Sequence, residues 1–246
     1  MTPTGLVVCG MVERISTGIA ELDKMVEGGF PKASTILVKG PPGSFKTILC
    51  LQMLYNAAKN RIPGLYITFN QSVDGIKEQA MQFGWNFDGL PVEFISFDAT
   101  TDIDLEASVV NTVKEKKAGI IVFDSLTSFL SRPPITSIGY QSDPMIEAIK
   151  RFPGVKISED ALIRAMTARL IRRMSYGNSI IMFIYEDQTL EGIRAVCEYL
   201  VDGVLRLSRI ESIGKRTLAI EKMRYTRHDF LPRTMVLREN GISIEG

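Results

Sequence analysis

The chain has 246 residues, of which 45% are hydrophobic and 23% charged, so its composition excludes a disordered or fibrous protein. Its 29 Lys and Arg residues nearly balance its 28 Asp and Glu residues, and a net charge of +1 gives no general attraction to nucleic acid or to an anionic membrane. This length suits one large core, so we expect a single domain over residues 1–246.

The cysteines and the hydropathy pattern indicate the compartment. Cys9, Cys50 and Cys197 are far apart and form no CxxC spacing, which argues against a disulfide framework or a zinc site. No apolar run approaches the roughly 18 residues of a membrane span. Residues 1–12, interpreted as a short N-terminal arm, lack the basic start of a signal peptide. We therefore expect a cytoplasmic protein with reduced thiols and no membrane span.

Strand-like and helix-like segments alternate along most of the chain. Short apolar runs rich in β-branched and aromatic residues predict buried strands at 35–38, 65–69, 94–97, 120–123 and 180–184. Helical spacing of apolar residues predicts crossover helices at 48–59, 73–83, 105–116 and 159–174. This alternation predicts an α/β fold with three layers and a mostly parallel sheet.

The pattern changes after Glu191, where no further long helix is expected. Short apolar runs separated by polar turns occur at 204–207, 217–224, 234–238 and 242–244. They predict an antiparallel C-terminal extension of the sheet. Residues 131–156 contain scattered prolines among Ser, Gly and Asp, and we expect an irregular inserted loop there.

A segment rich in Gly and Pro joins the strand at 35–38 to the next helix, which is the setting of a phosphate-binding loop. The candidate ATP-binding residues are Gly40, Pro41, Pro42, Gly43, Ser44, Phe45, Lys46, Thr47 and Ile48. Backbone N–H groups at a helix N-terminus can surround phosphate, the Lys46 ammonium can reach the β and γ phosphates, and the Thr47 hydroxyl can bind Mg²⁺.

Phe45 departs from the GxxxxGK[ST] pattern of such loops, which places glycine before the lysine. Glycine serves there because the chain must turn tightly against the phosphates without a Cβ. An ordinary turn between a strand and a helix is therefore the alternative interpretation of this segment.

Asp124 and Ser125 directly follow the apolar strand at 120–123. An Asp at the carboxyl end of a parallel strand points into the crevice where ligands bind, and it can hold Mg²⁺ through water, with Ser125 assisting. Capping of the next helix is the alternative role. The phosphate-binding segment upstream favours the magnesium role for Asp124.

Several motifs together resemble KaiC-like and RadA-like ATPases of the RecA superfamily. They are RISTGI at 14–19, ELD at 21–23, GGFP at 28–31, LVKGPPG at 37–43, GLYITF at 64–69, FGW at 83–85, FDS at 123–125 and LVDG at 200–203. The similarity runs from about Arg14 to the C-terminus, and within that span residues 131–156 look unlike the family. It implies a RecA-like P-loop domain that binds ATP with Mg²⁺ and forms homo-oligomers.

The same resemblance implies a pair of glutamates after the strand at 65–69, one of which would activate the attacking water. This chain has Asn70 and Gln71 there, and an amide cannot accept a proton as a carboxylate does, so a rate gain of roughly 10²–10⁴-fold should be lost. Gln71 can still orient a water. Glu186 resembles a residue near the γ-phosphate that relays the nucleotide state, and it is the alternative carboxylate. Residues 70–72 can also simply cap the next helix.

Lys222 and Arg224 are two residues apart on a predicted strand and should project from the same face. KaiC-like proteins carry a similar Lys-x-Arg element that reaches the nucleotide of the neighbouring subunit. The resemblance therefore assigns catalytic support across an interface to Lys222 and Arg224, with His228 as a weaker candidate. A charged edge strand that prevents aggregation is the alternative.

Three functions are consistent with these features. The favoured one is a nucleotide-responsive, homo-oligomeric switch that binds ATP and Mg²⁺, with weak or absent hydrolysis. The second is a DNA-stimulated ATPase resembling RadA paralogues of recombination and repair, since the helix at 159–174 carries Arg164, Arg169, Arg172 and Arg173. Nucleic-acid binding is not favoured, because no aromatic residues interleave with these arginines. The third is a structural partner that has lost nucleotide binding through Phe45.

Overall fold

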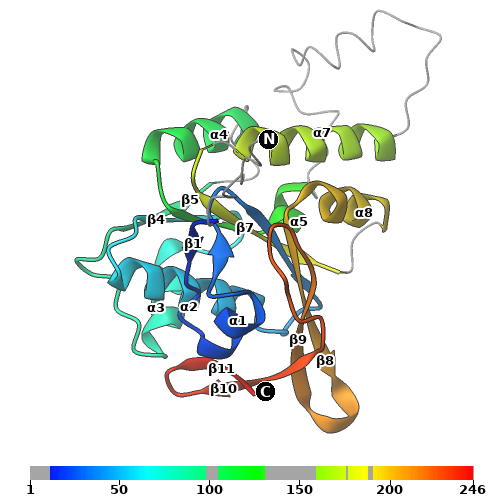
Figure 1. Ribbon diagram of the computed structural model, residues 1–246. Helices are drawn as coiled ribbons and strands as arrows, with labels where there is room; N and C mark the ends of the chain where they lie inside the picture. Colours follow the sequence, from blue (N-terminus) through cyan, green and yellow to red (C-terminus); the bar gives the residue numbers. More distant parts are fainter. Residues whose placement is uncertain (1–11, 98–104, 131–158, 176, 188–190, 246) are drawn as a thin grey trace, which may run out of the picture.

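The structure is a computed structural model that describes residues 12–97, 105–130, 159–175, 177–187 and 191–245 (Figure 1). The inserted loop expected at 131–156 and residues 1–11 of the expected N-terminal arm lie outside these ranges. Within them, no helix is both long and apolar enough to cross a membrane. Cys50 and Cys197 are buried and form no disulfide.

Among the described residues, nine strands form one sheet in the order β11-β10-β9-β8-β3-β7-β6-β4-β5. The strands from β8 to β5 run parallel to one another, and β9, β10 and β11 continue the sheet in antiparallel pairs. Their bounds are β3 Thr35–Gly40, β4 Gly64–Thr68, β5 Val92–Ser96, β6 Ile120–Asp124, β7 Ile180–Glu186, β8 Gly203–Ile210, β9 Lys215–Met223, β10 Arg233–Arg238 and β11 Gly241–Glu245. The predicted sheet is confirmed, although its antiparallel part begins at β9, because β8 is parallel to β3.

Helices cover both faces of this sheet (Figure 1). One face carries α1 (Ala20–Met25), α2 (Lys46–Lys59) and α3 (Val73–Met81), and the other carries α4 (Leu105–Lys116), α5 (Leu126–Leu130), α7 (Glu159–Met174) and α8 (Glu191–Leu200). Side chains alternate along a strand, so Ile36 and Val38 pack in the core beneath α2 while Leu37 packs in the opposite core. The predicted three-layer α/β fold is therefore confirmed. A short pair, β1 (Arg14–Ile15) and β2 (Phe30–Pro31), forms a separate sheet.

Helix α8, with 10 residues, is a short helix that the sequence analysis did not predict. Its apolar side chains Ile193, Val196, Cys197 and Leu200 recur at helical spacing, and Ile193 and Cys197 are buried. The period is present in the sequence, but this helix is shorter than the window of roughly 11–18 residues in which such a period is recognised.

Helix α7 contributes to the core as a crossover helix, with Leu162, Met166, Leu170 and Ile171 buried. Two of its arginines bind the buried carboxylate of Glu106 on α4, Arg169 at 2.6 and 3.1 Å and Arg173 at 2.8 Å. Breaking such a pair would leave an uncompensated buried charge. These two arginines therefore join α7 to α4, as Figure 1 shows the helices side by side.

Candidate functional site

The glycine- and proline-rich loop leaves β3 at Gly40 and enters α2 at Lys46, at the carboxyl end of the parallel strands. Phe45, the residue before the helix, has φ 73° and ψ 20°, which is the left-handed region. This conformation costs a non-glycine residue about 1–2 kcal/mol. The chain therefore makes the turn for which the motif uses glycine, although its residue there is Phe.

Lys46 is almost completely buried within this loop. Its Nζ donates hydrogen bonds to the backbone oxygens of Gly40 at 3.0 Å and Pro41 at 2.9 Å. Burial lowers the pKa of the Lys46 ammonium, while the charges of Glu186 and Asp124 act in the opposite direction. Neutral carbonyl groups are weaker partners for an ammonium than phosphate is, so this site would favour an anion.

Thr47 and Asp124 meet beside the loop, as the motif interpretation requires. Thr47 Oγ1 donates to Asp124 Oδ2 at 3.1 Å, and the hydroxyl of Tyr66 on β4 donates to the same oxygen. Burial raises the pKa of Asp124, and the two hydrogen bonds partly oppose that effect. Tyr66 is wholly buried, and the sequence analysis missed it. In the sequence, the one feature that could have identified Tyr66 is its hydroxyl within a mostly apolar strand.

These residues fit a magnesium ion bound together with phosphate. Among the described residues, no cluster of three or more His, Cys, Asp or Glu side chains could hold a metal alone. Mg²⁺ commonly takes one or two protein oxygens and completes its shell with water and phosphate.

The Ser44 Oγ is buried and, within the described part of the chain, has no hydrogen-bond partner. A Cβ on Gly40 would lie 2.2 Å from the backbone oxygen of Leu207 and 2.8 Å from Ser44 Oγ, so a side chain does not fit at this point of the loop.

The two amides that replace glutamates follow β4. Asn70 Nδ2 donates to Ser128 Oγ on α5, the helix after Asp124. The backbone N–H of Gln71 donates to Thr68 Oγ1 at 3.2 Å. The Ser72 side chain accepts from the backbone of Gly75 at 3.1 Å and caps α3. Ser72 caps the helix, so the side chains of Asn70 and Gln71 are not needed for capping.

Two carboxylates at the end of β7 lie near the loop. Glu186 is the register partner of Gly40 between β7 and β3. Its backbone N–H donates to Thr127 Oγ1 at 2.8 Å. The next residue, Asp187, also interacts electrostatically with Lys46, and its backbone N–H donates to the Gly40 carbonyl at 3.3 Å. The sequence analysis missed Asp187, because it follows the last apolar residue of the strand by two positions.

Lys222 and Arg224 bind the C-terminus of α8. Lys222 Nζ donates to the backbone oxygens of Glu198 at 2.8 Å, Tyr199 at 3.1 Å and Val201. Arg224 reaches the same Tyr199 oxygen at 3.3 Å. Both side chains therefore project to one side, and their positive charge suits the carbonyl end of a helix.

This pair lies away from the loop of its own chain. Met223 pairs with Gly203 of β8, which pairs with Ile36 near the start of β3, whereas the loop follows the end of β3. The structure thus brings Lys46, Thr47, Asp124 and Glu186 to one end of the sheet and places Lys222 and Arg224 toward the other. His228 Nδ1 lies 3.3 Å from the backbone oxygen of Thr226.

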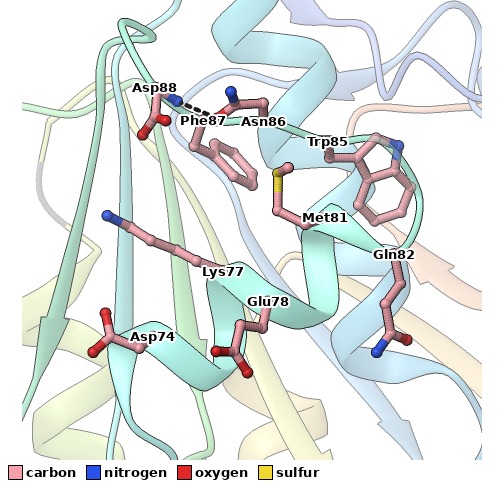
Figure 2. A pocket seen from close by; sticks show the side chains of 9 residues that line it. All are labelled: Asp74, Lys77, Glu78, Met81, Gln82, Trp85, Asn86, Phe87 and Asp88. Carbon is pink, nitrogen blue, oxygen red and sulfur yellow. Dashed lines mark hydrogen bonds between the residues drawn. The ribbon is translucent and has the colours of Figure 1, made fainter.

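A separate hollow of about 630 Å³ lies along α3 and the turn that follows it (Figure 2). Its lining residues are Asp74, Lys77, Glu78, Met81, Gln82, Trp85, Asn86, Phe87 and Asp88. None of them belongs to the loop or is one of the expected magnesium ligands. We therefore place the candidate nucleotide site at the loop.

Comparisons with known proteins concern the chain as a whole. The family described as "ATPase: KaiC" matches residues 15–246. A UPF0273 protein of Thermotoga maritima is 28% identical, over 95% of this chain and 96% of the relative. The circadian clock oscillator protein KaiC of Picosynechococcus is 27% identical, over 95% of this chain and 44% of that protein.

The fold has a counterpart among solved structures. The crystal structure of a KaiC-like protein from Pyrococcus horikoshii matches with a TM-score of 0.75, covering 96% of this chain and all of that one, at 24% identity. At this identity the likeness concerns the fold. The family match over residues 15–246 shows that the chain belongs to the KaiC-like ATPase family.

Proposed function

We propose that this protein binds ATP with Mg²⁺ at the loop from Gly40 to Ile48. The main support is the convergence of Lys46, Thr47 and Asp124 beside a loop that keeps its tight turn at Phe45. In this proposal Lys46 binds the β and γ phosphates, and Thr47 and Asp124 hold Mg²⁺, which would neutralise phosphate charge.

We further propose that hydrolysis is slow. Asn70 and Gln71 carry amides where KaiC-like proteins have glutamates, so neither side chain can take a proton from water. Gln71 would orient the water in any residual reaction. Glu186 is the nearby alternative carboxylate, because it lies beside Gly40 and interacts with Lys46.

The proposed activity is that of a nucleotide-responsive switch in a homo-oligomer. Lys222 and Arg224 are too far along the sheet to serve the loop of their own chain, which supports a role at the nucleotide of a neighbouring subunit. Moving there would remove both cations from the C-terminus of α8. Nucleotide occupancy in one subunit would then change the stability of a helix end in the next.

The other two functions receive less support. Arg169 and Arg173 are held by Glu106, so two of the arginines that would bind DNA already have a buried partner. Phe45 adopts the required turn, which weakens the case for lost nucleotide binding.

Calorimetry with MgATP on the parent protein and on Lys46→Ala tests the proposal. We expect binding that weakens at least about 100-fold in the variant, because a buried charge-assisted contact is lost. Lys59→Ala, at the exposed end of the same helix, is the matched control and should bind normally. Equal binding by Lys46→Ala would place the nucleotide elsewhere.

The switch is tested on the same samples. Light scattering with and without MgATP should show a change in oligomer size, and phosphate release should be slow. Rapid release stimulated by single-stranded DNA would instead support the DNA-dependent ATPase.

A further inference from the structure

Arg216 on β9 contacts the phosphate-binding loop at two points. Its guanidinium lies over the ring of Phe45, with the central carbon 4.1 Å from the ring centroid. Its Nε–H donates to the backbone oxygen of Gly43 at 2.9 Å. The two contacts flank Ser44, the buried residue whose hydroxyl points into the loop without a partner among the described residues.

The geometry of Phe45 explains why such contacts matter. The residue is in the left-handed region, which a side chain with a Cβ disfavours. One part of the ring packs against the core beneath α2, and Arg216 covers the ring from the hairpin side. A planar guanidinium can stack on an aromatic face while its N–H donates to a carbonyl. Both interactions favour the conformation that the backbone at Phe45 would otherwise resist.

The β8–β9 hairpin places Arg216 over the loop. Arg206 of β8 pairs in register with Lys39 of β3, so the hairpin continues past the end of β3, as Figure 1 also shows. Arg209 and Arg216 are directly opposite each other in this hairpin. Arg209 also lies near the loop. A Cβ built on Gly43 would be 3.6 Å from Nη1 of the Arg209 guanidinium.

We propose that Arg216 is a positioning residue for the phosphate-binding loop and compensates for the missing glycine by holding Phe45 and Gly43. The proposal rests on the proposed binding of ATP at this loop. It assigns Arg216 no contact with the nucleotide. Its effect on ATP affinity should therefore depend on whether residue 45 needs support.

A double-mutant cycle tests this dependence with MgATP titrations by calorimetry. Arg216→Ala should weaken MgATP binding about tenfold, since a stacking contact and a hydrogen bond to the loop are lost together. In the Phe45→Gly background the turn no longer needs support, because glycine adopts it freely. There, Arg216→Ala should change the dissociation constant by less than about twofold.

Two further variants separate positioning from simple attraction of phosphate by positive charge. Arg216→Lys keeps the charge but not the planar group, so it should restore little affinity. Arg206→Ala is the matched control, because Arg206 is on the same hairpin and pairs with Glu221 at 2.9 Å. It should bind MgATP like the parent protein, and thermal unfolding without nucleotide verifies that each variant is folded.

The outcomes distinguish this inference from the proposed function. If the parent protein binds MgATP and Arg216→Ala is equally harmful in both backgrounds, or Arg216→Lys restores full affinity, the positioning role is wrong and ATP binding stands. If the parent protein binds no MgATP, the positioning role of Arg216 and the proposed ATP binding are both overturned.

Discussion

Phe45 and the pair Asn70 and Gln71 both replace residues that the family pattern places at this end of the sheet, but the protein surrounds them differently. Phe45 is held in the left-handed turn by Arg216 and by the core beneath α2. Asn70 instead binds Ser128, and Gln71 contributes its backbone to a turn. A glycine that is needed for backbone shape can be replaced where neighbours hold that shape. A carboxylate that is needed as a base cannot be replaced in this way by an amide, and Glu186 is the nearby alternative carboxylate.

This contrast separates binding from hydrolysis. Lys46 is hydrogen-bonded within the loop and Thr47 is hydrogen-bonded to Asp124, whereas the place expected for the base carries amides. A protein with this arrangement would hydrolyse bound ATP slowly, which suits the proposed switch better than a motor. Substitutions can test each part of this contrast, the phosphate-binding loop and the missing base.

The largest effect should come from restoring the carboxylates with Asn70→Glu and Gln71→Glu together. We expect phosphate release to rise by roughly 10²-fold, because a general base is returned to the attacking water. The affinity for MgATP should stay within a few-fold, since the loop is unchanged. Gln82→Glu, which adds a carboxylate at the far end of α3, is the control. An unchanged rate would mean that the missing base does not limit hydrolysis.

A smaller effect should appear in the pH dependence of MgATP binding. Burial raises the pKa of Asp124, so on acidification this carboxylate takes up a proton at a higher pH than an exposed Asp does. Protonation removes a magnesium ligand, and we expect binding to weaken as the pH falls through that raised pKa. Without Mg²⁺ the ionised carboxylate opposes folding, so stability from this group decreases as the pH rises through the same window. Asp124→Asn should abolish both dependences in calorimetry and thermal unfolding.

Tyr66→Phe tests the support of Asp124 without changing the packing of the ring. It removes one of the two hydrogen bonds that lower the pKa of Asp124, so the onset of weaker binding should move to still higher pH. At a fixed pH above that window, MgATP should bind several-fold more weakly, and unfolding should require about 1–3 kcal/mol less free energy. Tyr55→Phe, on α2 and outside this contact, should change neither quantity. A pH profile identical to that of the parent protein would contradict the role of Tyr66.

The sequence predicted the parts of the protein that local pattern encodes. Helix α7 matches its predicted bounds, and the loop motif predicted the turn before α2 and named Lys46 and Thr47 as candidates, because their spacing is fixed within one segment. Strand order and the direction of β8 were not predictable, since both depend on which distant segments pair. Arg216 was missed for the same reason, because it meets Gly43 across 173 positions of the chain.

The smallest effect should come from Gln71→Ala, which tests whether the Gln71 amide supports the residual hydrolysis of ATP. The side chain is exposed, and the turn is held by the backbone N–H of Gln71, so folding and MgATP affinity should change by less than about twofold. Residual phosphate release should fall several-fold if the amide orients the water, as a glutamine can. Single-turnover measurements with excess protein are needed, because the expected rates are low. An unchanged rate would remove Gln71 from the reaction and make Glu186→Gln the next variant, since Glu186 is the carboxylate paired in register with Gly40 of the loop.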